Sequence, residues 1–173
     1  MPGPRGGNPD GAHRVREARN LSCVTPSQLL GSWSFTRTIA DHRRRSEYRA
    51  GGTATFGAEP DGRIRWFEEG RLVWQARSSA FTRTLFLVPP ADDNADWSVT
   101  FEDGRFFHPW SADEVVHLCG RDTYRGDVDS QTSPDPGAAA DCQAGWTLTW
   151  RVTGPAKDYT MRTHYQPRVG SRV

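Results

Sequence analysis

The sequence has few aliphatic residues, only three cysteines and no long apolar run. No segment approaches the roughly 20 apolar residues that a membrane-spanning helix needs, so we expect no membrane partner. No apolar run follows the first charges of the N-terminal segment, which argues against a secretory signal. Cys23, Cys119 and Cys142 form no CxxC pair, so neither a disulfide framework nor a structural zinc site is expected. These absences predict a reduced, cytoplasmic protein.

An excess of charge of one sign and the common cofactor motifs are also missing. The 22 basic residues nearly cancel the 21 acidic ones, which argues against a nucleic-acid binder, since that function needs a clustered basic surplus. Lysine is almost absent, because Lys157 is the only one in a background of arginine. There is no P-loop, GxGxxG, GxSxG or HExxH segment. We therefore expect no cofactor and no metal, and any chemistry would rest on side-chain acids and bases.

Large rings are plentiful instead. Aromatic residues make up 11% of the chain, including seven tryptophans, and such rings fit the pleated surface of a β-sheet. Short segments in which apolar and polar residues alternate predict nine or ten strands. These segments are 33–39, 52–56, 64–69, 72–76, 81–88, 97–101, 105–108, 115–119, 146–152 and 158–165. Turn signals separate several of them, at Asp61-Gly62, Glu69-Gly70 and Asp103-Gly104.

Short connections between so many strands predict antiparallel pairing, in either a sandwich or a closed up-and-down barrel. The barrel is favoured because closure removes the exposed edges and encloses a cavity for a small ligand. We predict a single all-β barrel domain over residues 21–173, after a disordered tail over residues 1–20. Residues 89–96 and 127–143 are polar and rich in proline or small side chains, so we expect loops there.

One short helical turn is expected over residues 26–30, with Thr25 as its N-cap. It leads directly into a Gly-Ser-Trp segment that ends at Trp33 on the first strand. This order resembles the opening of lipocalins and other calycins. The resemblance implies a lipocalin-like barrel in which Trp33 closes one end beneath an arginine, either Arg162 or Arg168.

Three motifs in the second half of the chain resemble a family of unknown function from bacteria and fungi, whose members are expected to be lipocalin-like. The motifs are DGRxFH at residues 103–108, HxCxxDxY at residues 117–124 and WxVxGPxKxY at residues 150–159. The resemblance covers roughly residues 29–168. It supports the barrel and draws attention to these residues, but it implies no particular reaction.

The densest polar cluster is expected at His117, Cys119, Asp122 and Tyr124. The first two share a strand face, and Gly120 can bend the strand so that the last two share a face again. In this arrangement His117 acts as a base oriented by Asp122, and Tyr124 acts as an acid. The alternative is a buried structural network in which the carboxylate and the phenol satisfy the histidine. A metal site is less favoured, because the spacing matches no zinc pattern.

Arg105 could stabilise developing negative charge if it points into the barrel. Strict alternation places Arg105 and Phe107 on one strand face and Phe106 and His108 on the other. The sequence leaves open which face is internal. The apolar face that ends at Phe101 favours Arg105 inside.

Glu68 shares a strand face with Ile64 and Trp66, which predicts a carboxylate among rings inside the barrel. Such a group would have a raised pKa and could act as a general acid or base. The alternative is a strand-end charge paired with Arg71.

Three further residues are candidates of lower rank. Lys157 follows a Gly-Pro turn, so we expect it at a barrel mouth, solvated or paired with an acid rather than forming a Schiff base. His164 lies on the last strand, where haem-binding calycins carry an axial ligand, but its face is opposite the apolar one and should be external. His108 belongs here because its face is ambiguous.

Two functions fit these expectations. The first is a cofactor-independent enzyme (a cyclase, dehydratase or isomerase) that acts on an aromatic or polyketide-like metabolite through His117, Asp122, Tyr124 and Arg105. The second is a non-catalytic binding protein for a hydrophobic ligand or haem. The side chains expected to contact the ligand are Trp33, Trp66, Glu68, Cys119, Trp146, Trp150, Tyr159 and Tyr165. The expected partner is a hydrophobic or aromatic small molecule, with a homodimer as an additional option.

Overall fold

The computed structural model describes residues 25–92, 95–111, 113–130 and 145–168. Within these ranges the chain forms ten strands and one short 3-10 helix. The elements are η1 (Pro26–Leu29), β1 (Gly31–Asp41), β2 (Ser46–Ala58), β3 (Ile64–Trp74), β4 (Arg77–Val88), β5 (Ser98–Phe101), β6 (Phe106–Pro109), β7 (Val115–Cys119), β8 (Asp122–Ser130), β9 (Trp146–Thr153) and β10 (Asp158–Pro167). The expected tail at residues 1–20 lies outside the described residues, as do Cys23 and Cys142.

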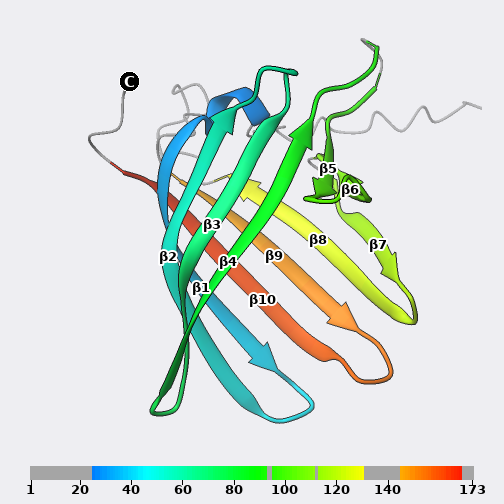
Figure 1. The fold of residues 1–173 in the computed structure, drawn as a ribbon. Helices are drawn as coiled ribbons and strands as arrows, with labels where there is room; N and C mark the ends of the chain where they lie inside the picture. The colour runs from blue at the N-terminus through cyan, green and yellow to red at the C-terminus, as the bar shows by residue number, and fades with distance from the viewer. Residues whose placement is uncertain (1–24, 93–94, 112, 131–144, 169–173) are drawn as a thin grey trace, which may run out of the picture.

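All ten strands belong to one antiparallel sheet, whose order is β6-β5-β4-β3-β2-β1-β10-β9-β8-β7. Strands that pair are neighbours in the chain, apart from β1 and β10. The sheet curls into a barrel in which β6 comes beside β7 without pairing with it (Figure 1). This arrangement confirms the predicted all-β antiparallel barrel.

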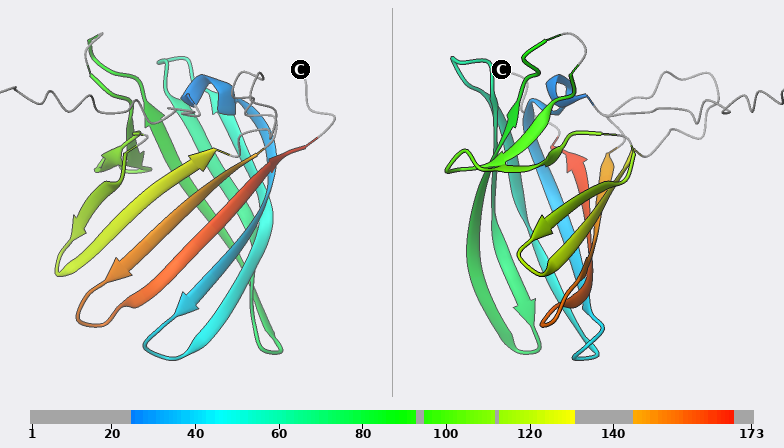
Figure 2. Two further views of the ribbon diagram at one scale, coloured as in Figure 1. Left: turned by 180° about the vertical axis from the view of Figure 1, so that it is seen from behind. Right: turned by 90° about the vertical axis from the view of Figure 1, so that its right-hand side faces the viewer.

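The two ends of the barrel differ. η1 lies at one end, which we call the closed end, and the β1–β2, β3–β4, β7–β8 and β9–β10 hairpins project from the other, the open end (Figures 1 and 2). The long strands β1, β2 and β3 have 11, 13 and 11 residues. β5 and β6 have only four residues each, so residues 77–84 of β4 have a strand partner on one side only.

β3 runs unbroken through the position where the sequence predicted a turn, at Glu69-Gly70. Gly70 lies opposite Gly52 of β2, and a Cβ on Gly52 would collide with the Glu69 carbonyl oxygen. A Cβ on Gly70 would come within 3.1 Å of the tip of the Phe35 ring. Glycine is needed here because two strands and a ring approach closely, and not because the chain turns.

A hairpin replaces the bent strand that was expected after Cys119. Gly120 has a φ of +61° and forms, with Arg121, the two-residue turn between β7 and β8. Glycine suits this turn because positive φ costs it little. The hairpin makes His117 and Tyr124 direct cross-strand neighbours.

A loop was predicted at residues 127–143, but residues 127–130 belong to β8. Its pairing with β9 continues to Ser130, and residues 131–144 lie outside the described residues. The predicted number of strands agrees with the observed number because two errors compensate for each other. Segments 64–69 and 72–76 form the single strand β3, while β8 is not among the predicted strands.

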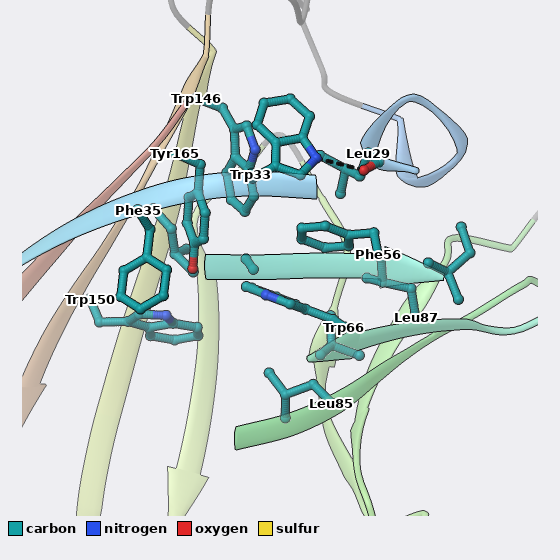
Figure 3. Packing of buried hydrophobic residues seen from close by; sticks show 14 of the residues in the cluster. Leu29, Trp33, Phe35, Phe56, Trp66, Leu85, Leu87, Trp146, Trp150 and Tyr165 are labelled. Atoms are coloured by element: carbon teal, nitrogen blue, oxygen red, sulfur yellow. Dashed lines mark hydrogen bonds between the residues drawn. The ribbon is translucent and has the colours of Figure 1, made fainter. Parts of the chain in front are cut away.

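Aromatic rings fill the closed end of the barrel (Figure 3). Trp66, Trp146 and Tyr165 are each at most 1% exposed. Trp146 stacks on Tyr165 with 4.0 Å between ring centroids, and Trp66 meets both rings edge-on. Rings in such offset and edge-to-face contacts gain packing energy beyond their buried area, so this end is solid core.

η1 covers this core through Trp33. The indole Nε1 of Trp33 donates to the Leu29 carbonyl oxygen at 2.7 Å, and both side chains are buried (Figure 3). The arginine cover expected from the lipocalin resemblance is wrong. Arg162 and Arg168 are both exposed, and Arg168 donates to the Thr53 hydroxyl.

Candidate functional site

One carboxylate lies fully inside the barrel, below the aromatic end. Glu68 of β3 is 0% exposed, which confirms that it points inward. Arg37 of β1 donates through Nη2 to both of its oxygens, at 3.0 and 2.8 Å, and Arg83 of β4 donates to Oε1 at 2.9 Å. The Tyr165 hydroxyl of β10 donates to Oε1 at 2.5 Å. Side chains from four strands therefore meet at this carboxylate.

The predicted raised pKa of Glu68 is wrong. Burial alone would raise it, but the charges of Arg83 and Arg37 and the hydrogen bond from Tyr165 favour the carboxylate, and the pKa is lowered. Glu68 is therefore ionised at neutral pH and is no general acid. The alternative partner Arg71 is exposed on the outer face, so that pairing is wrong too.

A cavity of about 190 Å³ adjoins Arg37 on the side of the open end. Its lining residues are Arg37, Ile39, Ala50, Leu72, Ser79, Ala80 and Phe81. Arg37 is the only charged residue among them, and its guanidinium carbon lies 5.9 Å from the centre of the Phe81 ring. The cavity is therefore an apolar space with a cation at its inner end.

A second group of ionisable residues lies at the open end, where the β7–β8 and β9–β10 hairpins meet. The Lys157 ammonium lies 2.8 Å from the Asp122 carboxylate and donates to the Tyr124 hydroxyl at 2.7 Å. A Cβ on Gly154 would collide with the Asp122 carboxylate. Glycine at that position therefore lets the carboxylate lie across the turn and reach the lysine.

Lys157 is held in its charged form. Its hydrogen bonds to Asp122 and Tyr124 raise its pKa above the ordinary value. A Schiff base needs a neutral amine, so this contact disfavours one, and the expected pairing of Lys157 with an acid is confirmed. Beside it, burial and the neighbouring Tyr124 raise the pKa of Tyr159 to about 12.

His117 faces the same space but is not the partner of Asp122. Its ring lies edge-on to Phe107, with 4.8 Å between centroids. Asp122 pairs with Lys157 instead, so the expected orientation of His117 by Asp122 is wrong. The hairpin explains this, because it places Asp122 opposite Cys119, two residues further towards the turn than His117.

Arg105 does not point into the barrel, contrary to expectation. Its side chain is 77% exposed, and its Nε donates to the Asp103 carboxylate at 2.6 Å. Its guanidinium lies over the Phe101 ring, 5.4 Å from the ring centre. Arg105 therefore caps the outside of the β5–β6 turn and lies apart from the other three proposed catalytic residues.

A β-bulge in β6 makes Phe107 and His108 both face inward. Val99 pairs with His108 and Thr100 with Phe106, so Phe107 is the extra residue. Phe106 is 59% exposed and His108 only 3%. Burial lowers the pKa of His108 to about 4, so the ring is neutral at neutral pH. The expected grouping of Arg105 with Phe107 and of Phe106 with His108 assumed strict alternation. The alternation fails at this bulge.

Comparison with known families decides where the chain belongs. The model of a family of unknown function, DUF6314, matches residues 29–167. The chain belongs to this family. The match spans the whole barrel from the end of η1 to the end of β10, and therefore includes both groups of ionisable residues. The DUF6314 family carries no assigned activity, and no curated protein matches the chain.

Solved structures show the fold of this DUF6314 member. The S-type phycobiliprotein lyase CPES from Guillardia theta matches with a TM-score of 0.59 and 10% identity, over 85% of this chain and 92% of that chain. A protein from Nitrosomonas europaea described as a candidate AttH matches with a TM-score of 0.29 and 9% identity, over 95% of this chain and 59% of that chain. The first likeness agrees with a calycin-like barrel, and the second is too weak to inform the fold.

Half of the side chains expected to contact a ligand are packed against one another at the closed end. These are Trp33, Trp66, Trp146 and Tyr165. Trp150 is also buried, whereas Cys119 is exposed at the end of β7. Tyr159 is half-buried near the open end. His164 is on the outer face, where its Nδ1 lies 3.2 Å from the Thr147 hydroxyl.

Arg37 and Arg83 were not predicted from the sequence to be members of the interior site. Each alternates with apolar residues that point inward, Arg37 with Phe35 and Arg83 with Leu85. An arginine on an otherwise apolar strand face was the available signal. It was hidden because nearly every basic residue of this chain is an arginine.

The described ranges contain no helix that is long and apolar enough to cross a membrane. In the same ranges, no three His, Cys, Asp or Glu side chains lie close enough together to hold a metal ion.

Proposed function

We propose that the protein binds an aromatic or polyketide-like metabolite in the open half of its barrel and acts on it as a cofactor-independent acid–base enzyme. The contact that carries this proposal joins the Lys157 ammonium to the Tyr124 hydroxyl at 2.7 Å. Cyclisation, dehydration and isomerisation fit, since each needs only a shaped pocket, an acid and a base. The shared fold with a phycobiliprotein lyase supports lyase-type chemistry on such a barrel.

Tyr124 is the proposed acid. When its hydroxyl gives a proton to a ligand oxygen, the adjacent ammonium of Lys157 stabilises the phenolate that remains. Asp122 holds that ammonium from its other side at 2.8 Å. Lys157 thus takes the charge-stabilising role that the sequence analysis gave to Arg105.

His117 is the proposed base, because its ring lies beside Tyr124 on the paired strand, with 5.9 Å between centroids. The base takes a proton from the carbon between the carbonyl and the double bond of an unsaturated ketone while Tyr124 delivers one to the ligand oxygen, which gives a dienol. The histidine then returns its proton to a different carbon, and the ligand oxygen returns its proton to the phenolate. Both side chains regain their starting forms, and the net reaction is an isomerisation.

A non-catalytic binding protein is the second candidate, favoured by the apolar cavity of about 190 Å³. In that case the contacts among Lys157, Asp122 and Tyr124 only join two hairpins. Haem is not favoured as the ligand, because His164 contacts Thr147 on the outer face.

The test is conversion of a metabolite extract from cells that naturally contain the protein, followed by mass spectrometry. The wild type should consume one compound and yield a product of equal mass or one lighter by a water molecule. Tyr124→Phe should slow this conversion by about 100-fold, the size of a lost general acid. Tyr48→Phe is the matched control, since Tyr48 also lies near the open end but stacks on Trp74 away from the lysine.

The outcomes separate the two candidates. Equal conversion by the wild type and Tyr124→Phe would show that this tyrosine is not the acid. A compound that binds to both proteins and is never converted would establish the binding function instead.

A further inference from the structure

We propose that Arg37, reinforced by the charge of Arg83, is an internal anion-binding site that selects ligands carrying a carboxylate or phenolate group. The ligand body would occupy the adjoining cavity. The inference rests on the proposed function only in requiring that a ligand enters the barrel. It names the substrate class as a small acid with an aromatic or apolar body.

The group around Glu68 has one positive charge in excess, shared between a buried Arg37 (7% exposed) and a partly exposed Arg83 (30% exposed). Two guanidiniums, from Arg37 and Arg83, face this one carboxylate, and among the described residues no other carboxylate pairs with either of them. Tyr165 adds no negative charge, because burial raises the pKa of its hydroxyl far above the ordinary value. His108 is neutral as well. Water screens part of the charge on Arg83, so a second anion would be stabilised chiefly on the buried side, at Arg37.

Glu68 has no capacity left to neutralise this excess. Its Oε1 already accepts hydrogen bonds from Arg37, Arg83 and Tyr165, and its Oε2 accepts one from Arg37. Arg37 uses Nη2 for the carboxylate and Nε for the Thr163 hydroxyl at 2.8 Å. The Tyr165 side chain also interacts with the Arg37 guanidinium. We assign Nη1, which makes neither the Glu68 nor the Thr163 contact, as the donor to a ligand oxygen.

The space for the rest of such a ligand adjoins Arg37. The cavity measures about 190 Å³, and an apolar cavity of about 150 Å³ takes up benzene. A phenyl ring therefore fits against Ile39, Leu72 and Phe81, with its acid group towards the guanidinium. Because the apolar lining and the cation are adjacent, the site can distinguish an acid from a neutral molecule of the same shape.

Isothermal titration calorimetry with cinnamate and its neutral isostere cinnamamide tests this inference. The two probes share the phenyl body and differ in the charge of one terminal group. We expect the wild type to bind cinnamate at least about 10-fold more tightly than cinnamamide, because a charge-assisted hydrogen bond forms to the buried guanidinium of Arg37. Equal affinities, or binding of neither probe, would overturn the inference.

Two variants should shift this preference in opposite directions. Arg83→Gln leaves Arg37 and Glu68 as a neutral pair, so the preference for cinnamate should fall below about 3-fold. Glu68→Gln removes the internal anion and leaves both guanidiniums, so the affinity for cinnamate should rise by about 3-fold or more. A group of residues that only stabilises the fold would give weaker cinnamate binding in both variants, and that result would contradict the proposal.

Arg77→Gln is the matched control for Arg83→Gln. Arg77 lies on the same face of β4 but is exposed at the open end, so this variant should keep the wild-type preference. Cinnamamide affinity reports whether the cavity is intact in each variant. If Glu68→Gln does not fold, the comparison of Arg83→Gln with Arg77→Gln decides the question.

The failure of this proposal can be told apart from the failure of the acid–base proposal. Tyr124→Phe should bind cinnamate as the wild type does, because Tyr124 is not among the residues that line the cavity. Retained cinnamate preference without metabolite conversion would leave the anion site standing and reject the enzyme. Metabolite conversion without any preference for cinnamate over cinnamamide would support the enzyme and reject the anion site.

Discussion

The closed and open halves of this barrel contain the same kinds of ring but use them differently. At the closed end Trp66 and Trp146 are at most 1% exposed and contact other rings. At the open end Trp74, Tyr124 and Tyr159 are half-buried, and the two tyrosines lie beside Lys157. Aromatic content alone therefore does not distinguish core from site. What distinguishes them is how completely each ring is buried.

Removing one indole from each half should give the largest contrast. Trp146→Ala should lower the free energy of unfolding by about 4 kcal/mol, because it leaves a large cavity in solid core. The buried Nε1 of Trp146 has no hydrogen-bond partner in the described residues, so the loss reflects packing alone. Trp74→Ala should cost about 1 kcal/mol, since that ring is half-exposed and its ring contact within the described residues is with Tyr48. Urea denaturation measures both, and equal losses would remove the distinction between the halves.

His108 lies between the two halves, and its titration should give the next largest effect. Its pKa of about 4 lies below the ordinary 6.5, chiefly because burial disfavours the charged ring. The unfolded chain therefore binds the proton more readily. This contribution to stability is complete above pH 6.5 and is lost as the pH falls towards 4, by up to about 3 kcal/mol.

The His108→Gln variant isolates this effect, because its amide does not titrate. Unfolding free energies of both proteins should be measured by urea denaturation across the same pH range. The stability of the wild type should fall more steeply than that of the variant as the pH falls to 4. Parallel curves would show that His108 is not held neutral by burial.

Lys157→Met should have the smallest effect on stability, although it lies in the proposed catalytic group. The side chain of Lys157 is 40% exposed, and a surface ion pair of this kind contributes less than about 1 kcal/mol. The variant should unfold at nearly the wild-type urea concentration while its metabolite conversion falls as in Tyr124→Phe. A loss of stability comparable to that of Trp146→Ala would show that the open half is structural core too.

The barrel could be predicted from the sequence because alternation and turn residues are local signals. They identified the antiparallel pairing, the helical turn before Trp33 and the inward direction of Glu68. They failed at Gly70, where glycine serves close packing between strands. They also failed at Gly120, which is part of a two-residue hairpin turn rather than a bend in one strand.

The site was less predictable because its members come from distant strands. Lys157 meets Asp122 across two hairpins, and Arg37 meets Glu68 across a sheet register that no local pattern reveals. The pKa of Glu68 was mispredicted for the same reason, since its direction depends on those partners. The bulge at Phe107 shows a further limit, because one extra residue reverses the facing of the residues around it.

The strand order has a consequence for how the chain folds. In space the strands run from β7 to β10 and then from β1 to β6, so the chain enters the sheet in its middle. Among the described strands, β1 and β10 are the only paired strands that are distant in sequence. Forming this pair therefore carries the entropic cost of closing a long loop. A circular permutant that began at β7 and ended at β6, with the original ends joined by a linker, would make every pair of bonded strands consecutive in the chain. Its contact order would be lower, and it should fold faster than the natural chain.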